Sequence, residues 1–158
     1  MKVRLDNAVR QYIKARDKNL CTTCGIHKDS TLLGYLDWSH KISRTNLLLR
    51  WDERNSIAQC RRCHLDWGNG VTEPLNNAIN KLWGEGTTIK LELFSKQNQT
   101  IKGTPLDDVE YRLKLEKFYK LKLKAILGSY NTEDIIWDDL VDLNQYEQNK
   151  QLEKNKVC

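Results

Sequence analysis

The sequence lacks the segments that mark membrane proteins, secreted proteins and chains of linked domains. No apolar run approaches the roughly 20 residues of a membrane-spanning helix, so we expect no membrane partner. The first residues, Met1–Asp6, contain no apolar stretch of the signal-peptide kind. The 158 residues include only two prolines, with no internal repeat and no low-complexity linker. We therefore expect one hydrophobic core, or one small domain with an extension.

Charge is distributed unevenly along the chain. The formal net charge is +5, and basic residues outnumber acidic ones up to about residue 128, whereas acidic residues dominate 129–158. A basic surface suits a polyanionic partner such as nucleic acid. An ordinary solvated surface explains the same composition, so charge alone does not decide between the two.

Four of the five cysteines form two C-x2-C pairs, Cys21 with Cys24 and Cys60 with Cys63. Two such pairs far apart in the chain supply the four thiolates of a tetrahedral zinc site. We expect the protein in a reducing cytoplasm, where paired cysteines of this spacing bind metal and do not form disulfides. The pattern therefore predicts a structural Zn2+ that joins two remote segments.

Periodicity and capping residues predict an α+β fold with more helix than strand. A strand within 32–42 ends near His40, a loop follows with 47–50 as an alternative short strand, and 56–59 is extended. The predicted helices cover 6–18 with Asp6 as N-cap, 61–68, 72–83, 87–97, a long run to Gly128 that starts from a capping box at 104–107, and an acidic helix from 131 to about 152. We therefore expect a ββα-metal core at 1–71, which consists of the two extended segments, the helix at 61–68 and the zinc. A helical extension follows at 72–158.

Three polar residues on this frame indicate hydrolytic chemistry. A neutral His40 at the end of its strand can accept a proton from water. Because successive helix residues diverge by about 100°, Cys63 can face the zinc while His64 faces a cleft and holds a second cation. Asn55 can brace the loop that carries His40. The alternative for His64 is a substitute zinc ligand or a surface residue.

Arginines and tryptophans around these residues are candidates for contact with nucleic acid. Guanidinium groups bind phosphate in a fork, which makes five arginines candidate contacts to the DNA backbone. They are Arg44, Arg50, Arg54, Arg61 and Arg62. Arg61 and Arg62 could instead neutralise a zinc–thiolate centre. Trp38, Trp51 and Trp67 could stack on unpaired bases, but in a domain of this size two of the three are expected in the core.

The motifs together resemble those of the NinG (Rap) recombination nucleases of lambdoid phages, which belong to the HNH, or His-Me finger, superfamily. The resemblance covers about residues 18–128 and is carried by C-x2-C, Trp-Ser-His-x2-Ser-Arg, Leu-Arg-Trp-Asp-Glu-Arg-Asn, Gln-C-x2-C-His and Gly-Asn-Gly. It implies a ββα-metal fold and Mg2+- or Mn2+-dependent cleavage of branched or partly single-stranded DNA, such as Holliday junctions or D-loops, in phage recombination. It also implies that His40 is the general base, Asn55 the loop brace, His64 the catalytic-metal ligand and the cysteines the zinc ligands.

One departure from the superfamily pattern keeps alternatives open. Ser39 precedes His40 where many HNH enzymes have an aspartate that helps to bind the metal. Asp37 lies two residues further back, about 7 Å away along a strand, and Glu53 and Glu73 are other candidate carboxylates. One alternative is a non-catalytic zinc-dependent module that binds DNA or protein. Another is an HNH nuclease of restriction, homing or non-specific type. A homodimer through the helical extension would suit a symmetric junction.

Overall fold

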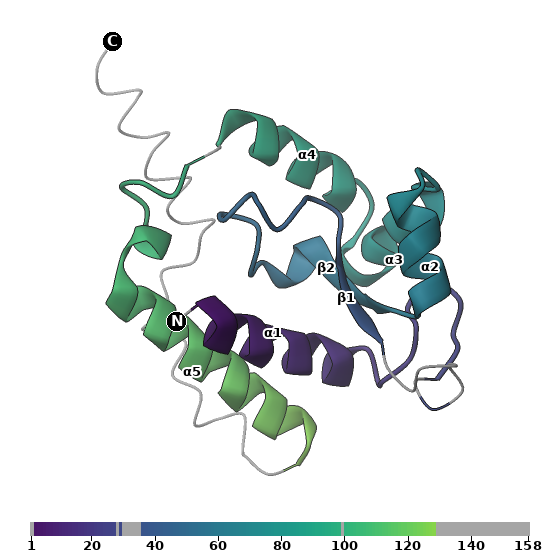
Figure 1. Ribbon diagram of the computed structural model, residues 1–158, viewed down its shortest axis with the longest axis horizontal. Helices are drawn as coiled ribbons and strands as arrows, with labels where there is room; N and C mark the ends of the chain where they lie inside the picture. The colour runs from purple at the N-terminus through teal and green to yellow at the C-terminus, as the bar shows by residue number, and fades with distance from the viewer. Residues whose placement is uncertain (1, 28, 30–35, 99, 129–158) are drawn as a thin grey trace.

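The computed structural model describes residues 2–27, 29, 36–98 and 100–128, and the chain has an α+β fold (Figure 1). In this part of the chain five α-helices accompany one two-stranded sheet and short 3-10 turns. The helices are α1 (Lys2–Arg16), α2 (Arg61–Gly68), α3 (Glu73–Trp83), α4 (Thr87–Gln97) and α5 (Val109–Ile126). The strands are β1 (Asp37–His40) and β2 (Ser56–Gln59), and the 3-10 turns are η2 (Glu53–Asn55) and η3 (Pro105–Asp107).

The two strands run antiparallel, with Asp37 opposite Gln59 at one end and His40 opposite Ser56 at the other. The strands therefore lie where the sequence predicts them. The alternative strand at 47–50 was wrong, because Asn46 folds this segment into turns. Its side-chain oxygen accepts hydrogen bonds from the backbone N–H groups of Leu48 and Leu49, at 3.1 and 3.3 Å.

Helices α2, α3 and α4 follow the predicted spans, but two predicted helix starts were wrong. Helix α1 starts at Lys2, and Asp6 lies inside it, where its carboxylate binds Arg50 and Trp51. Helix α5 is capped by Asp108, whose carboxylate accepts from Glu110 N. Thr104 does not cap it, since its hydroxyl donates back to the Ile101 carbonyl at 2.7 Å. The predicted acidic helix at 131–152 lies outside the described residues.

Helices α1 and α5 lie side by side and share one hydrophobic cluster (Figure 1). Leu5 and Ile13 from α1 pack there with Leu106 and with Tyr119 from α5. The Tyr119 hydroxyl also donates to the Trp51 carbonyl at 2.6 Å. The predicted boundary between residues 71 and 72 therefore does not separate two cores, because the described part of the extension completes the core of the N-terminal part.

A second cluster covers β2 with α3 and α4. Ile57 of β2 is fully buried against Leu75 and Ile79 of α3 and Leu91 of α4. The sheet thus has helices on opposite sides, and Figure 1 shows it between α4 and α1. Within the described residues, no helix is long and apolar enough to cross a membrane.

Candidate metal centre and active site

The four cysteines of the two predicted pairs meet at one point. The Sγ atoms of Cys21, Cys24, Cys60 and Cys63 all lie within 4.8 Å of one another. The Sγ atoms of Cys24 and Cys60 are 3.8 Å apart. Four sulfurs placed about 2.3 Å from a tetrahedral ion would be about 3.8 Å from each other. The donor type and the spacing therefore fit one metal ion.

Two local structures bring the cysteines together. The first pair lies on a tight turn, in which Gly25 N donates to the Cys21 carbonyl at 2.7 Å and Gly25 has a φ of +77°. Thr22 N binds the Ala58 carbonyl at 2.9 Å, which attaches this turn to β2. Cys60 follows β2 as the N-cap residue of α2, so that Cys63 lies in the first turn of the helix. The cluster therefore joins the first turn, the end of the sheet and the start of α2.

The thiols of the cluster differ in acidity. Burial raises the pKa of Cys24 and of Cys63, and the neighbouring thiols raise that of Cys63 further. Burial has the same tendency at Cys21, but backbone N–H groups of Cys60 and Cys24 lower the pKa of that thiol. Four thiolates this close would repel one another unless a cation lies between them. The cluster is therefore a place where a metal ion changes the charge state of the protein.

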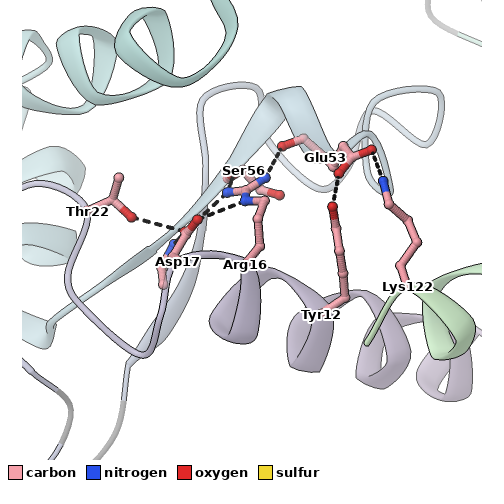
Figure 2. A network of polar contacts seen from close by, with 8 residues as sticks. Tyr12, Arg16, Asp17, Thr22, Glu53, Ser56 and Lys122 are labelled. Carbon is pink, nitrogen blue, oxygen red and sulfur yellow. Dashed lines mark hydrogen bonds and ion pairs between the residues drawn. The ribbon is translucent and has the colours of Figure 1, made fainter. Parts of the chain in front are cut away.

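Hydrogen bonds from the end of α1 reinforce the same region (Figure 2). The Asp17 carboxylate accepts from Ala58 N at 2.7 Å and from the Thr22 hydroxyl at 3.0 Å. The neighbouring Arg16 guanidinium binds Asp17 and also the carbonyls of Glu53 and Ser56, at 2.8 and 2.9 Å. These bonds fix β2 relative to α1 and to the turn that carries Cys21.

Glu53 binds elsewhere and does not lie with the histidines. Its carboxylate accepts from the Tyr12 hydroxyl, and from the Lys122 ammonium at 2.6 Å (Figure 2). It thereby joins α1 and α5 to the loop before β2. Both oxygens are occupied, so the structure gives no support to Glu53 as the replacement carboxylate for a catalytic metal.

His40 is buried at the end of β1, with 7% of its surface exposed. Its ring packs on the same sheet face as Trp38, with 4.2 Å between the ring centroids. Its Nε2 lies 3.1 Å from the Arg50 carbonyl oxygen. Since a carbonyl oxygen can only accept, Nε2 carries the proton and the lone pair of the neutral ring is on Nδ1.

The surroundings of His40 favour its neutral form. Burial lowers its pKa to about 4, and the nearby charges of Arg44 and Arg50 act in the same direction. Hydrogen bonding to the Arg50 carbonyl opposes this shift only in part. At neutral pH the ring is therefore uncharged and able to accept a proton.

Asn55 holds the loop that carries the Arg50 carbonyl. Its side chain is fully buried and makes three hydrogen bonds to the backbone. The amide nitrogen donates to the carbonyls of Ile42 and Leu49, at 3.0 and 2.9 Å. The amide oxygen accepts from Ile42 N at 2.7 Å. The two ends of the loop are thereby tied together on either side of His40.

His64 and Asp37 meet at the end of the sheet where the cysteines lie. His64 Nδ1 lies 2.9 Å from Asp37 Oδ2, and Arg61 Nη1 lies 3.5 Å from the same oxygen. Despite the short distance, the contact does not have the direction of a hydrogen bond, and Nδ1 is buried without a hydrogen-bond partner in the described part of the chain. Adjacent ligands of an octahedral Mg2+, each about 2.1 Å from the ion, lie about 3 Å apart. The pair therefore fits two neighbouring positions on one divalent cation.

The pair does not form a larger cluster. Within residues 2–27, 29, 36–98 and 100–128, the four cysteines are the one group of three or more His, Cys, Asp or Glu side chains close enough to hold a metal. Glu73, the other candidate carboxylate, is an exposed residue in the first turn of α3. Water and phosphate oxygens would have to complete the coordination of an ion held by Asp37 and His64.

The five candidate arginines have different surroundings. Arg50 binds Asp6 through Nε at 2.8 Å and Arg54 binds Asp52 through Nη2 at 2.7 Å, so both are held by acidic side chains. Arg61 contacts Asp37, and Arg62 is exposed on α2. Arg44 is exposed in the loop after β1, and its guanidinium makes no hydrogen bond or ion pair to the rest of the described chain. Of the five, Arg44 and Arg62 are therefore the two that are open to an external anion.

The tryptophans divide as expected between core and periphery. Trp38 and Trp51 are buried, with 6% and 2% exposed. Trp67 is partly buried beside the cluster that covers β2, and Lys41 Nζ lies 5.3 Å from the centre of its ring. Trp38 and Trp51 thus pack in the interior and are not placed to stack on bases.

Sequence reasoning missed Asp17, Arg16 and Asp6 as residues that position the site. Asp17 and Arg16 follow the last apolar residues of α1, where charged side chains are usually solvated. Only the low exposure of Asp6 and Asp17 reveals that they have buried partners. No local pattern in the sequence indicates those partners, which lie about 40 residues away.

Comparisons with protein-family models, with curated proteins and with solved structures found no match for this chain. The candidate site consists of a four-cysteine cluster, an anchored neutral histidine, and a partly buried aspartate–histidine contact.

Proposed function

We propose that the protein is a metal-dependent DNA endonuclease of the HNH, or His-Me finger, type. In this proposal β1, β2 and α2 are the ββα-metal core, and a structural Zn2+ is bound by Cys21, Cys24, Cys60 and Cys63. The substrate class is branched or partly single-stranded DNA, as in recombination, and a homodimer through the helical extension would match a symmetric junction. The observation that carries the proposal is the anchored, neutral His40.

His40 is suited to the proton transfer that phosphodiester hydrolysis needs. With Nε2 donating to the Arg50 carbonyl, Nδ1 can take a proton from water while the water oxygen bonds to phosphorus. The bond from phosphorus to the leaving oxygen then breaks, and that oxygen takes up a proton from the solvent. The three backbone bonds of Asn55 keep the Arg50 loop, and therefore the ring, in one orientation. This pre-organisation supports a role as general base.

Asp37 and His64 are the side chains that would hold Mg2+ or Mn2+. Their oxygen and nitrogen atoms suit such ions, and the unpartnered Nδ1 of His64 has no other role in the described structure. When bound, the ion would offset charge that develops on the scissile phosphate. Asp37 thus replaces the carboxylate that Ser39 does not provide.

The proposal is tested by cleavage of a matched set of DNA substrates. Linear duplex, single strand, flap and four-way junction are incubated with no added metal, with Mg2+, with Mn2+ and with EDTA. We expect metal-dependent cutting, with branched DNA preferred. His40→Ala should slow it by about 10²- to 10⁴-fold, which is the usual contribution of a positioned general base. His27→Ala is the matched control, because that side chain is partly exposed and pairs with Asp29 instead of with a residue of the candidate active site.

Two results would contradict the proposal. Full cleavage by His40→Ala would show that His40 is not the general base. Tight DNA binding without cutting in any metal would show that the protein is not a nuclease. The second result would favour a non-catalytic zinc-dependent module that binds DNA or protein. This alternative is compatible with the structure, because Asp37 and His64 supply only two ligands for a catalytic metal. Equal cutting of all substrates would support nuclease activity but not the preference for branched DNA, and would favour an HNH nuclease of non-specific, restriction or homing type.

A further inference from the structure

An open hollow of about 660 Å³ lies between the start of α1 and the loop after β1. Its lining combines basic side chains, hydroxyl groups and one leucine. The residues are Lys2, Ser43, Arg44, Thr45, Leu47 and Arg50. No acidic side chain lines it, so the hollow combines positive charge with hydrogen-bond donors of the kind that bind phosphate.

The charge of this hollow is only partly neutralised. Asp6 binds Arg50, whereas the described residues offer no ion-pair partner to the exposed side chains of Lys2 and Arg44. Helix α1 begins at Lys2 and has no acidic residue in its first turn. The positive end of its dipole therefore adds to the two side chains. Placing these like charges together has a free-energy cost that a bound anion would reduce.

The hollow is also held in shape by internal bonds. Arg50 Nη1 donates to the Arg44 carbonyl at 2.9 Å, which connects the two basic residues. Asn46 accepts from the backbone N–H groups of Leu48 and Leu49, and its amide nitrogen donates to Ser95 of α4 at 3.2 Å. A loop fixed in this way holds the backbone of Arg44, so that binding has to order only its side chain.

One residue connects this hollow to the candidate general base. The Arg50 side chain lines the hollow, and the Arg50 carbonyl accepts the hydrogen bond from His40 Nε2. A chain of phosphates that reaches His40 would therefore have its neighbouring phosphates close to Lys2 and Arg44.

We propose that this hollow binds a backbone phosphate of the DNA strand, next to the phosphate that is cut, through Arg44 and Lys2. The inference rests on the nuclease function proposed above and adds to it the place where the substrate strand is gripped. Since phosphate contacts do not read bases, this grip is independent of sequence and sets the position of the strand relative to His40.

The test measures DNA affinity against salt for the full chain, by fluorescence anisotropy without added Mg2+ or Mn2+. Arg44→Ala should weaken binding roughly fivefold at physiological salt and lower the slope of log affinity against log salt by about one. The double variant with Lys2→Ala should have a still lower DNA affinity and a still lower salt slope. Lys90→Ala, which removes an exposed lysine on α4, is the matched control. It should change the DNA affinity and the salt slope only by the small amount expected from losing one positive charge anywhere on the protein.

Unchanged affinity and slope in the Arg44 and Lys2 variants would overturn the inference, even if His40→Ala still abolished cleavage. Inorganic phosphate, compared with chloride at equal ionic strength, separates a free anion from a strand. If phosphate bound only to the protein with Arg44 but did not displace DNA, the hollow would be a free-anion site and the inference would be wrong. If no metal supported cleavage but the loss of affinity still followed Arg44, the nuclease proposal would fail and the DNA site would stand.

Discussion

The two ends of the short sheet are held by different means. At the end where Asp37 faces Gln59, four cysteine sulfurs converge within 4.8 Å and Cys60 begins α2. At the other end, where His40 faces Ser56, the buried Asn55 amide and the Arg16 guanidinium bind backbone carbonyls. In the proposed zinc-bound state the first end depends on the cation to offset its thiolates, whereas the second end is held by hydrogen bonds within the described residues. Metal content therefore affects one end of the candidate site more than the other.

As a consequence, the two histidines are held in place by different parts of the structure. The orientation of His64 depends on α2, which starts in the cysteine cluster, and its Nδ1 meets Asp37 at that end. His40 is held by the loop that Asn55 closes. Loss of metal from the cluster should thus disturb the proposed cation ligands before it disturbs the proposed base.

The largest expected effect comes from the cysteine end. Cys60→Ser removes a buried ligand from the cluster and should prevent zinc binding. Structural zinc contributes on the order of 10 kcal/mol, which is comparable with the whole stability of a small domain. We expect a variant without zinc and without a cooperative unfolding transition, measured by metal analysis and circular dichroism. Cys158→Ser is the control, and an unchanged melting temperature with one zinc retained in Cys60→Ser would refute the role of the cluster.

A smaller effect is expected at the hydrogen-bonded end. Asn55→Ala deletes three buried bonds and leaves the carbonyls of Ile42 and Leu49 without their donor. The cost should be about 3 kcal/mol in the free energy of unfolding, with zinc content unchanged. Denaturant unfolding and metal analysis measure the two quantities, and Asn77→Ala, on the exposed side of α3, is the control. Zinc loss in Asn55→Ala would show that the two ends are not independent.

The last effect, which is absent at neutral pH and develops only on acidification, is a pH dependence that His40 gives to the same end. Its pKa is about 4 in the folded protein and near 6.5 when unfolded, so the unfolded chain binds the proton more strongly. Stability should therefore fall as pH drops from about 6.5 to about 4, by roughly 3 kcal/mol in all. His40→Gln has no titratable group at this position, so its free energy of unfolding should fall less over the same pH range. Parallel stability curves for the two proteins, measured by urea unfolding, would contradict the assignment.

Much of the local structure was predictable because its causes are local. The C-x2-C turns, the two strands and the spans of α2, α3 and α4 follow from neighbouring residues. The shared face of Trp38 and His40 follows from strand alternation, and their rings do lie 4.2 Å apart. The start of α1 was not predictable in the same way. Asp6 resembles an N-cap until Arg50 and Trp51, about 45 residues away, bind its carboxylate inside the helix.

The sequence by itself determined which residues have the chemistry: four thiols, a strand-end histidine, and a histidine directly after the last cysteine of the cluster. Only the tertiary structure decided which of them meet. It placed Asp37 against His64, engaged Glu53 with Tyr12 and Lys122, and left Arg44 open beside a basic hollow. The physical reason is that side-chain type is a local property, whereas burial and partnership depend on how α1, α5 and the sheet pack together.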